Sequence, residues 1–318
     1  WGETGVAERV EDWNLDLLDA LLAQSGLKGE SMTAEILDGR AMAKEVRQEM
    51  LAEVEAFKEK HGFVPTIAGV GAGGDPASVS SGKMIKRSFE SAGMNFAIHT
   101  LPDTASQEEL IDLIATLNAD GSTNGIMVQE PMPRGLDEDE IKAAIRAIKD
   151  ADGVNPINAG RLALAGPVRD PDEVPDYLVP ATPLGGLEML KRAGVQMEGS
   201  RAVVVGRSNI VGRPMSFLLM QHNATVSMCH SRTRPLGAVT QTADILCTAV
   251  GVPHLIKGDM IKPGAVIIDF GFNRLGDQWV GDVDFEEAKE VAGMITPVPG
   301  GPGSMTNVML MRNVLLAA

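Results

Sequence analysis

The stretch that most constrains this chain is residues 201–214, which predict a strand, a tight turn and a helix in direct succession. Residues 203–205 are three valines, an apolar run typical of a strand buried on both faces of a parallel sheet. Gly206 ends the run, and Pro214 falls in the first turn of the expected helix, where proline is tolerated. A helix that starts directly after such a strand points its backbone N–H groups at the turn. The stretch is therefore suited to bind a phosphate.

The glycine spacing of this turn is unusual. Gly206 and Gly212 frame the pattern G-R-S-x-x-V-G, whereas the common dinucleotide motif is G-x-G-x-x-G. The local pattern alone therefore leaves two interpretations open: a nucleotide-binding turn, or an ordinary connection between a strand and a helix that binds nothing.

Composition limits the class of protein. The 318 residues are 44% apolar and 22% charged, which indicates a globular chain long enough for two domains. The net charge of −15 opposes general binding to nucleic acid or to an anionic membrane, but a small anionic ligand is still compatible with it. No apolar run is long enough to span a bilayer, and we expect no signal peptide.

Cysteine usage bears on the compartment and on metal binding. Cys229 and Cys247 are too few for a disulfide framework or a cysteine-rich metal site. We therefore expect a reduced, cytoplasmic setting and no metal.

Strand and helix patterns alternate along the chain, which predicts α/β architecture with parallel sheets. In the first half, strands are expected at 66–71, 96–101 and 125–128, and helices from Asp38, at 78–92, from Ser106 and at 137–148. In the second half, strands at 225–228, 245–249 and 265–269 join the central strand in a Rossmann-like sheet, and a last helix is expected at 305–316.

We expect two domains and an appendage. Residues 1–31 form an N-terminal extension, interpreted as a solvated or loosely docked segment, with a partner-binding helix as the alternative. Residues 32–160, with the C-terminal helix 304–318, form the first domain. Residues 161–303 form the Rossmann-like domain, and the active site is expected in the cleft between the two.

Several short motifs follow one another along the chain. Each is weak evidence by itself, and together, in this order, they are specific for a family. They are Gly-Asp-Pro-Ala-Ser at 74–78, Val-Gln-Glu-Pro-Met-Pro at 128–133, Asp-Ala-Asp-Gly at 150–153, Asn-Ala-Gly-Arg-Leu at 158–162, Gly-Arg-Ser-Asn-Ile-Val-Gly at 206–212, Cys-His-Ser-Arg-Thr at 229–233, Gly-Asp-Val-Asp-Phe at 281–285 and Thr-Pro-Val-Pro-Gly-Gly at 296–301. Through them the chain, from Met32 to Ala318, resembles the bifunctional methylenetetrahydrofolate dehydrogenase/methenyltetrahydrofolate cyclohydrolases of the FolD type.

The resemblance implies a cofactor site on Gly206, Arg207 and Ser208, with Ser231 at the end of the next strand. Rossmann enzymes that use NAD usually carry an acid at that second position, where this chain has Ser231 and Arg232. Hydroxyl and guanidinium groups suit a 2′-phosphate, so the sequence predicts NADP as the cofactor. Taken alone, Arg232 is equally compatible with a solvated surface charge.

The resemblance also implies a folate site. In the family, the glutamine equivalent to Gln129 supports the catalytic lysine, and the aspartate equivalent to Asp152 contacts the pterin-like ring. A carboxylate suits that ring because it accepts two parallel hydrogen bonds. Taken alone, Gln129 is a polar residue at a strand end and Asp152 is a turn-former. Further substrate contacts are implied at Ser81, Pro299, Gly300 and Gly301.

The chain departs from the family at its Tyr-x-x-x-Lys pair. The family tyrosine stacks on folate and the lysine serves the cyclohydrolase step, but these positions hold Ser81 and Ile85. Lys83 and Lys86 fall on other faces of the expected helix. The general acid/base position is therefore predicted to be lost. Hydrolysis should suffer most, because such a group is worth ~10²–10⁴ in rate, whereas hydride transfer depends mainly on positioning.

Other departures indicate a remodelled folate pocket. Glu130 replaces a leucine and Phe272 replaces an isoleucine beside the cofactor, while Pro302 and Ser304 alter the final loop.

The first hypothesis is an NADP-dependent oxidoreductase of one-carbon metabolism. It would oxidise 5,10-methylenetetrahydrofolate to 5,10-methenyltetrahydrofolate, with cyclohydrolase activity weak or lost. The alternatives are a catalytically silent paralogue that binds nucleotide or folate in a regulatory or scaffolding role, and a dehydrogenase of another one-carbon pterin. The family is usually dimeric through its cofactor domain, so a homodimer is expected.

Overall fold

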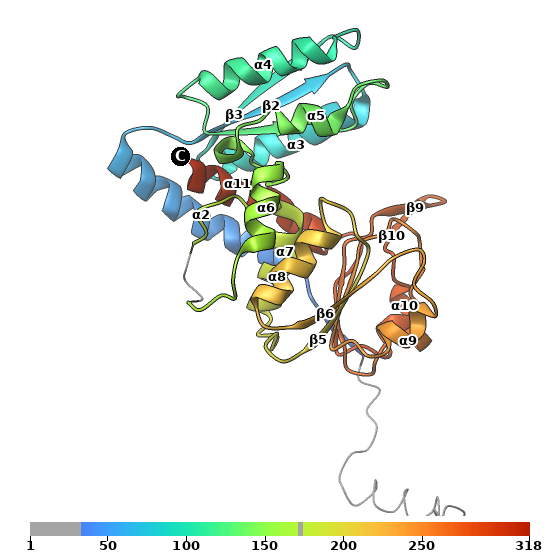
Figure 1. Cartoon of the computed structure of the whole chain (residues 1–318). Coiled ribbons are helices and arrows are strands. Elements are labelled where there is room, and N and C mark those ends of the chain that lie inside the picture. Colours follow the sequence, from blue (N-terminus) through green and yellow to red (C-terminus); the bar gives the residue numbers. More distant parts are fainter. Residues whose placement is uncertain (1–32, 171–173) are drawn as a thin grey trace, which may run out of the picture.

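The computed structural model describes residues 33–170 and 174–318, apart from the side chains of 76–79 and 81. Two α/β units lie at opposite ends of the molecule, with a layer of helices between them (Figure 1). The extension predicted at 1–31 lies outside the described residues. Within the described part of the chain, no helix combines the length and the apolar character needed to cross a membrane.

The first unit is built on a three-stranded parallel sheet. Its strand order is β3-β2-β4, and helices α3, α4 and α5 accompany it (Figure 1). The bounds are β2 (Thr66–Ala72), α3 (Pro76–Ser91), β3 (Asn95–Leu101), α4 (Gln107–Ala119), β4 (Gly125–Val128) and α5 (Glu138–Ala143). The three strands predicted from the sequence are confirmed, as is the capping box of Ser106 and Glu109 at the start of α4.

The helix predicted at 137–148 is wrong in its length. It ends at Ala143, and a separate 3-10 turn covers η1 (Ala147–Lys149). Side-chain amides from other segments capture the backbone carbonyls here: Asn118 donates to Ala144 and Asn155 donates to Ile145. Periodicity does not reveal such distant partners, so the sequence pattern overestimated the helix.

The second unit is a six-stranded sheet with all neighbouring strands parallel, in the order β1-β11-β8-β7-β5-β6. Its bounds are β1 (Glu35–Ile36), β5 (Arg201–Val205), β6 (Thr225–Cys229), β7 (Ile245–Thr248), β8 (Val266–Asp269) and β11 (Met294–Ile295). Helices α8 (Gly212–Gln221), α9 (Leu236–Thr240) and α10 (Phe285–Ala288) and a hairpin of β9 (Asn273–Leu275) and β10 (Gln278–Val280) complete it. The Rossmann-like sheet predicted from the sequence is confirmed.

Strand β1 corrects the predicted domain boundary. We expected residues from 32 onward to belong to the first domain, but Glu35 and Ile36 pair with Met294 and Ile295 at the edge of the second sheet. A two-residue edge strand has no periodicity that a sequence pattern could detect.

Four helices join the two units: α2 (Gly39–His61), α6 (Pro156–Leu164), α7 (Ala181–Arg192) and α11 (Pro302–Ala317). Helix α11 packs against both α7 and α2. A Cβ on Gly185 of α7 would lie 2.7 Å from Cβ of Met305, and one on Gly125 of β4 would lie 2.6 Å from Val314. The last helix therefore contacts the first sheet and also fixes the helix that leads into the second.

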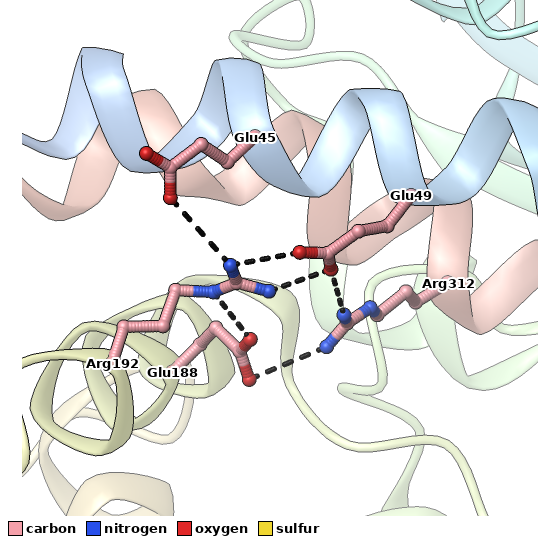
Figure 2. A network of polar contacts seen from close by, with 5 residues as sticks. All are labelled: Glu45, Glu49, Glu188, Arg192 and Arg312. Carbon is pink, nitrogen blue, oxygen red and sulfur yellow. Dashed lines mark hydrogen bonds and ion pairs between the residues drawn. The ribbon is translucent and has the colours of Figure 1, made fainter.

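An ion-pair network reinforces this layer (Figure 2). Arg192 of α7 contacts Glu49 of α2 through both terminal nitrogens, at 2.9 and 2.6 Å, and its Nε lies 2.8 Å from Glu188. Arg312 of α11 lies 3.4 Å from Glu49 and 3.3 Å from Glu188. Glu49 of α2 therefore contacts two other helices, α7 and α11, whereas Glu45 makes one contact to Arg192, at 3.7 Å.

We expect Glu49→Gln to lower the free energy of unfolding at neutral pH by ~1 kcal/mol, a value limited by solvent screening of this half-exposed group. Arg192 holds the pKa of Glu49 below its ordinary value of 4.5. The ionised carboxylate therefore stabilises the fold above that value, and its contribution is lost as pH falls through the lowered pKa. Urea unfolding at neutral and acid pH measures this. Glu45→Gln is the matched control and should have a smaller effect; equal effects of the two variants would contradict the prediction.

Candidate active site between the two units

A cavity of about 260 Å³ lies where the two units meet. Its wall combines α3, the end of β4, α5, the loop at 152–154, the start of α7 and the turn between β5 and α8. The lining residues are Ile85, Met127, Val128, Gln129, Glu130, Lys142, Asp152, Val154, Ala181, Thr182 and Ile210. The structure thus brings together three residues predicted for the site, Ile85, Gln129 and Asp152, and adds others that the sequence did not indicate.

Gln129 follows the last residue of β4, and its N–H donates to the carbonyl of Val70 on β2. Its side chain is 9% exposed and packs on Gly82 of α3, where a Cβ would lie 2.3 Å from Nε2. Any larger residue at position 82 would force the amide of Gln129 to move. The Nε2 atom has no hydrogen-bond partner in the described part of the chain. An unpaired buried donor is costly, so it is available to an acceptor on a bound molecule.

Asp152 lies in a loop that is fixed from both sides. Its carbonyl accepts from Ala181 N at the start of α7. Asn313 of α11 donates to the carbonyls of Ala151, at 2.7 Å, and Val179, at 2.8 Å. Gly153 adopts φ +71°, and a Cβ there would lie 2.4 Å from the backbone of Val179. The backbone around Asp152 is therefore set by the helical layer.

The electrostatics of the site raise the pKa of Asp152 to about 7. Burial is the main cause, the carboxyl of Asp150 adds to it, and the ammonium of Lys142 opposes it. Asp150 itself is buried and accepts from Asn155 N, at 2.7 Å, and from Nδ2 of Asn158, at 3.0 Å. Burial raises the pKa of Asp150 as well. Asp152 therefore changes its charge near neutral pH, which is typical of a functional carboxyl.

Helix α3 presents an apolar side chain to the cavity. Ile85, which the resemblance placed at the family lysine position, is 8% exposed and lines the wall. The side chain of Ser81 lies outside the described residues. Lys83 is exposed, and Lys86 lies 3.8 Å from Glu90 on the same helix. Neither lysine lines the cavity, so α3 supplies no described ionisable group to it.

One ammonium group nevertheless lines the cavity. Lys142 of α5 donates a hydrogen bond to Glu130, and its Nζ also lies 3.9 Å from Glu138. Its side chain is 15% exposed, against 49% for Glu130. The hydrogen bond and charge of Glu130 outweigh burial and raise the pKa of Lys142. Sequence reasoning noted Glu130 only as a departure from the family and missed Lys142, because a lysine among acids on a short helix is typical of a solvated face.

The expected cofactor turn has the predicted strand, turn and helix. Gly206 adopts φ +132°, and a Cβ there would lie 2.3 Å from the carbonyl oxygen of Ala249. Gly212 lies against the backbone of Gly206, where a Cβ would come within 2.4 Å. The hydroxyl of Ser208 accepts from Val211 N and Gly212 N. The turn therefore requires both glycines, although their spacing is not that of the common motif.

The other residues predicted to bind the cofactor follow strands β5, β6 and β8, at the same edge of the sheet as this turn. Arg207, Ser231 and Arg232 are all exposed. Phe272 is also exposed and stacks on Trp279 of β10, with ring centroids 4.3 Å apart. Among the residues of the turn, Ile210 lines the cavity described above.

The loop with Pro299, Gly300 and Gly301 is not part of the lining of this cavity. It packs on the start of α2, where a Cβ on Gly39 would lie 2.3 Å from the carbonyl oxygen of Gly301, and Gly301 caps α11. We expected Gln129 and Asp152 to face this loop directly, and the cavity does not bring them together. In the described residues, no group of three or more His, Cys, Asp or Glu side chains is placed to hold a metal.

Comparison with known proteins gives matches along almost the whole chain. The family model for the tetrahydrofolate dehydrogenase/cyclohydrolase catalytic domain matches residues 37–152, and that for the NAD(P)-binding domain matches residues 180–318. The bifunctional protein FolD of Roseiflexus sp. (strain RS-1) is 49% identical over 288 residues, which cover 90% of this chain and 97% of the relative.

Solved structures agree with these matches. The bifunctional FolD of Campylobacter jejuni is 39% identical, with a TM-score of 0.84 over 89% of this chain and 98% of its own. The FolD of Trypanosoma brucei, solved with NADP and an inhibitor, is 33% identical, with a TM-score of 0.82 over 89% of this chain and 97% of its own.

The raised pKa of Asp152 predicts a pH-dependent cost to stability. Between the ordinary pKa of 3.8 and about 7, the carboxyl is ionised in the unfolded chain but protonated in the folded one, so stability falls as pH rises through this window and then levels off. We expect Asp152→Asn to raise the free energy of unfolding above neutral pH by a few kcal/mol, at ~1.4 kcal/mol per pKa unit, and by much less in acid.

The control for this prediction is Asp120→Asn. Hydrogen bonds from Ser122 and Thr123 lower the pKa of Asp120 to about 2, so this substitution should destabilise the fold at neutral pH, with the opposite sign. Urea unfolding across the pH range measures both variants. A pH-independent effect of Asp152→Asn would contradict the assignment.

Proposed function

Because this chain belongs to the tetrahydrofolate dehydrogenase/cyclohydrolase family, we propose that its central cavity oxidises 5,10-methylenetetrahydrofolate with NADP as the hydride acceptor. The observation that carries the proposal is the cavity itself. It joins Gln129 and Asp152 of one unit to Ile210, in the glycine-framed turn of the other. Folate and nicotinamide bound at these two places would be neighbours, and hydride transfer depends mainly on such positioning.

Asp152 would bind the amino-pyrimidinone edge of the folate ring through two parallel hydrogen bonds. The loop fixed by Asn313 holds its backbone, so the carboxyl is pre-positioned. The buried Nε2 of Gln129 would find its missing acceptor on the bound substrate. Ser81, Pro299, Gly300 and Gly301 remain proposed substrate contacts on the family resemblance.

NADP would bind along the turn at 206–212. Backbone N–H groups at the start of α8 would meet the pyrophosphate, and Arg207, Ser231 and Arg232, all exposed, would be free to meet the 2′-phosphate. Phe272, stacked on Trp279, would lie beside the nicotinamide end. A homodimer and a cytoplasmic location remain part of this proposal.

Hydrolysis of the methenyl product is proposed to be weak. Ile85 occupies the position of the family lysine and cannot exchange a proton, and neither Lys83 nor Lys86 reaches the cavity. The product of oxidation should therefore accumulate as 5,10-methenyltetrahydrofolate. Purified protein, mixed with 5,10-methylenetetrahydrofolate and NADP, tests the proposal through the absorbances of NADPH and of the methenyl product. A silent paralogue would produce neither signal.

Arg207→Ala should narrow the preference for NADP over NAD by about tenfold or more, because a guanidinium–phosphate pair is a charge-assisted interaction worth ~1.5–3 kcal/mol. Kd values for NADP and NAD from fluorescence titration measure this. Arg213→Ala removes a guanidinium that is bonded to Asn209 instead, and should change the preference less. Equal affinity of the unmutated protein for the two nucleotides would refute the proposed role of the turn.

The double substitution Ser81→Tyr with Ile85→Lys should raise hydrolysis of 5,10-methenyltetrahydrofolate, up to the ~10²–10⁴-fold that a placed acid/base supplies. Gln129 lines the same wall and would be able to support the new lysine. Decay of the methenyl absorbance measures the rate, with Ser81→Tyr alone as the control. Rapid enzyme-dependent decay already present in the unmutated protein would contradict the proposed weakness of this step.

A further inference from the structure

The cavity contains a proton-exchanging pair that the family motif does not explain. Glu130 and Lys142 both line its wall together with Ile85, and they are hydrogen-bonded to each other. Among the described lining residues they are the one ammonium–carboxylate pair, and Asp152 is the only other ionisable group. The pair therefore lies in the cavity whose α3 wall has no described acid or base.

We propose that Glu130, held in place by Lys142, is the general base for the hydrolysis that remains in this cavity. This inference rests on the proposed function and names the group that serves its second reaction. Glu130 is the catalytic residue of the pair and Lys142 is the positioning residue.

The surroundings of Lys142, Asp152 and Glu130 determine which of the three can act as the base. Lys142 is paired with Glu130, lies 3.9 Å from Glu138 and feels the charge of Asp152. Its pKa is raised, so at neutral pH it is an ammonium without a free electron pair and cannot act as the base. Asp152 is partly protonated near pH 7 and is proposed to bind the folate ring. Glu130 remains, with a half-exposed carboxylate that water can reach.

The step balances without a further reactant. The oxygen of a water molecule bonds to the bridging methenyl carbon while its proton passes to the carboxylate of Glu130. One carbon–nitrogen bond of the adduct then breaks: the hydroxyl of the adduct loses its proton and becomes the formyl oxygen, and the leaving nitrogen gains a proton. One proton is released to solvent overall, and Lys142 stays protonated throughout.

The test uses the full chain in two assays: hydrolysis is measured with 5,10-methenyltetrahydrofolate supplied directly, and oxidation is measured separately with 5,10-methylenetetrahydrofolate and NADP. Glu130→Gln keeps the shape of the side chain and removes the base, and it should lower the ratio of enzyme-dependent hydrolysis to oxidation at least tenfold through kcat. Glu130→Asp should retain more hydrolysis than Glu130→Gln. Lys142→Arg should retain more than Lys142→Met, because arginine still donates to the carboxylate.

The matched control is Lys86→Met, which removes a lysine from an ion pair with Glu90 outside the cavity lining and should leave the ratio unchanged. An unchanged ratio in Glu130→Gln overturns the proposal. So does a protein that oxidises 5,10-methylenetetrahydrofolate but shows no enzyme-dependent hydrolysis, in which case the proposed dehydrogenase still stands. If Glu130→Gln does not fold, the comparison of Lys142→Arg with Lys142→Met decides, and equal loss in both overturns the role of the pair.

Discussion

The close packing of α7 against α11 is the constraint on which the cleft depends. Gly185 and Gly186 have no Cβ, and a Cβ would meet Met305 of α11 at 2.7 Å and Phe270 at the end of β8 at 2.4 Å. The helical layer can therefore lie close to both units at once. Asn313 on the same helix α11 donates to the carbonyls of Ala151, which precedes Asp152, and of Val179, which precedes α7. The distance between Asp152 and the turn at 206–212 is thus set by packing outside the cavity, and the ion pairs of Glu49 add to a contact that is already fixed.

The charges of the cavity are arranged in two groups with different roles. Burial of Asp152, together with the charge of Asp150, raises the pKa of Asp152 and keeps it near its titration point at neutral pH. Lys142 is hydrogen-bonded to Glu130. Its positive charge lowers the pKa of Asp152 somewhat, although the two residues do not pair. A substrate that places hydrogen-bond donors on Asp152 would favour its ionised form. Substrate binding is therefore expected to be linked to proton release from Asp152.

Much of the fold could be read from the sequence because its strands are short apolar runs that alternate with amphipathic helices. Residues 203–205, Asp38 as the cap of α2 and the Ser106–Glu109 capping box are local signals, and the structure has all three. The boundary near β1 and the early end of α5 depend on distant partners, Met294 and Asn155, which no local pattern contains. Helix α7 was missed for a similar reason: its Gly185 and Gly186 weaken the helical signal, and the space they leave is filled by distant residues, Met305 of α11 and Phe270 after β8.

The candidate site likewise contains residues that the sequence predicted and residues that only the fold reveals. Gln129, Asp152 and Ile85 were found because each falls in, or at a fixed distance from, a motif, and the cavity joins them. Lys142 lies outside every motif, ten residues before Asp152, and reaches the cavity because Ile141 is buried beneath α5 and fixes the rotation of that short helix. A motif records which residues a family uses, but it does not record which other side chains the fold places at the same surface. Where a motif position is expected to have changed, as at Ile85, the spatial neighbours are the first place to look for a replacement, and here they lie on α5 and at the end of β4.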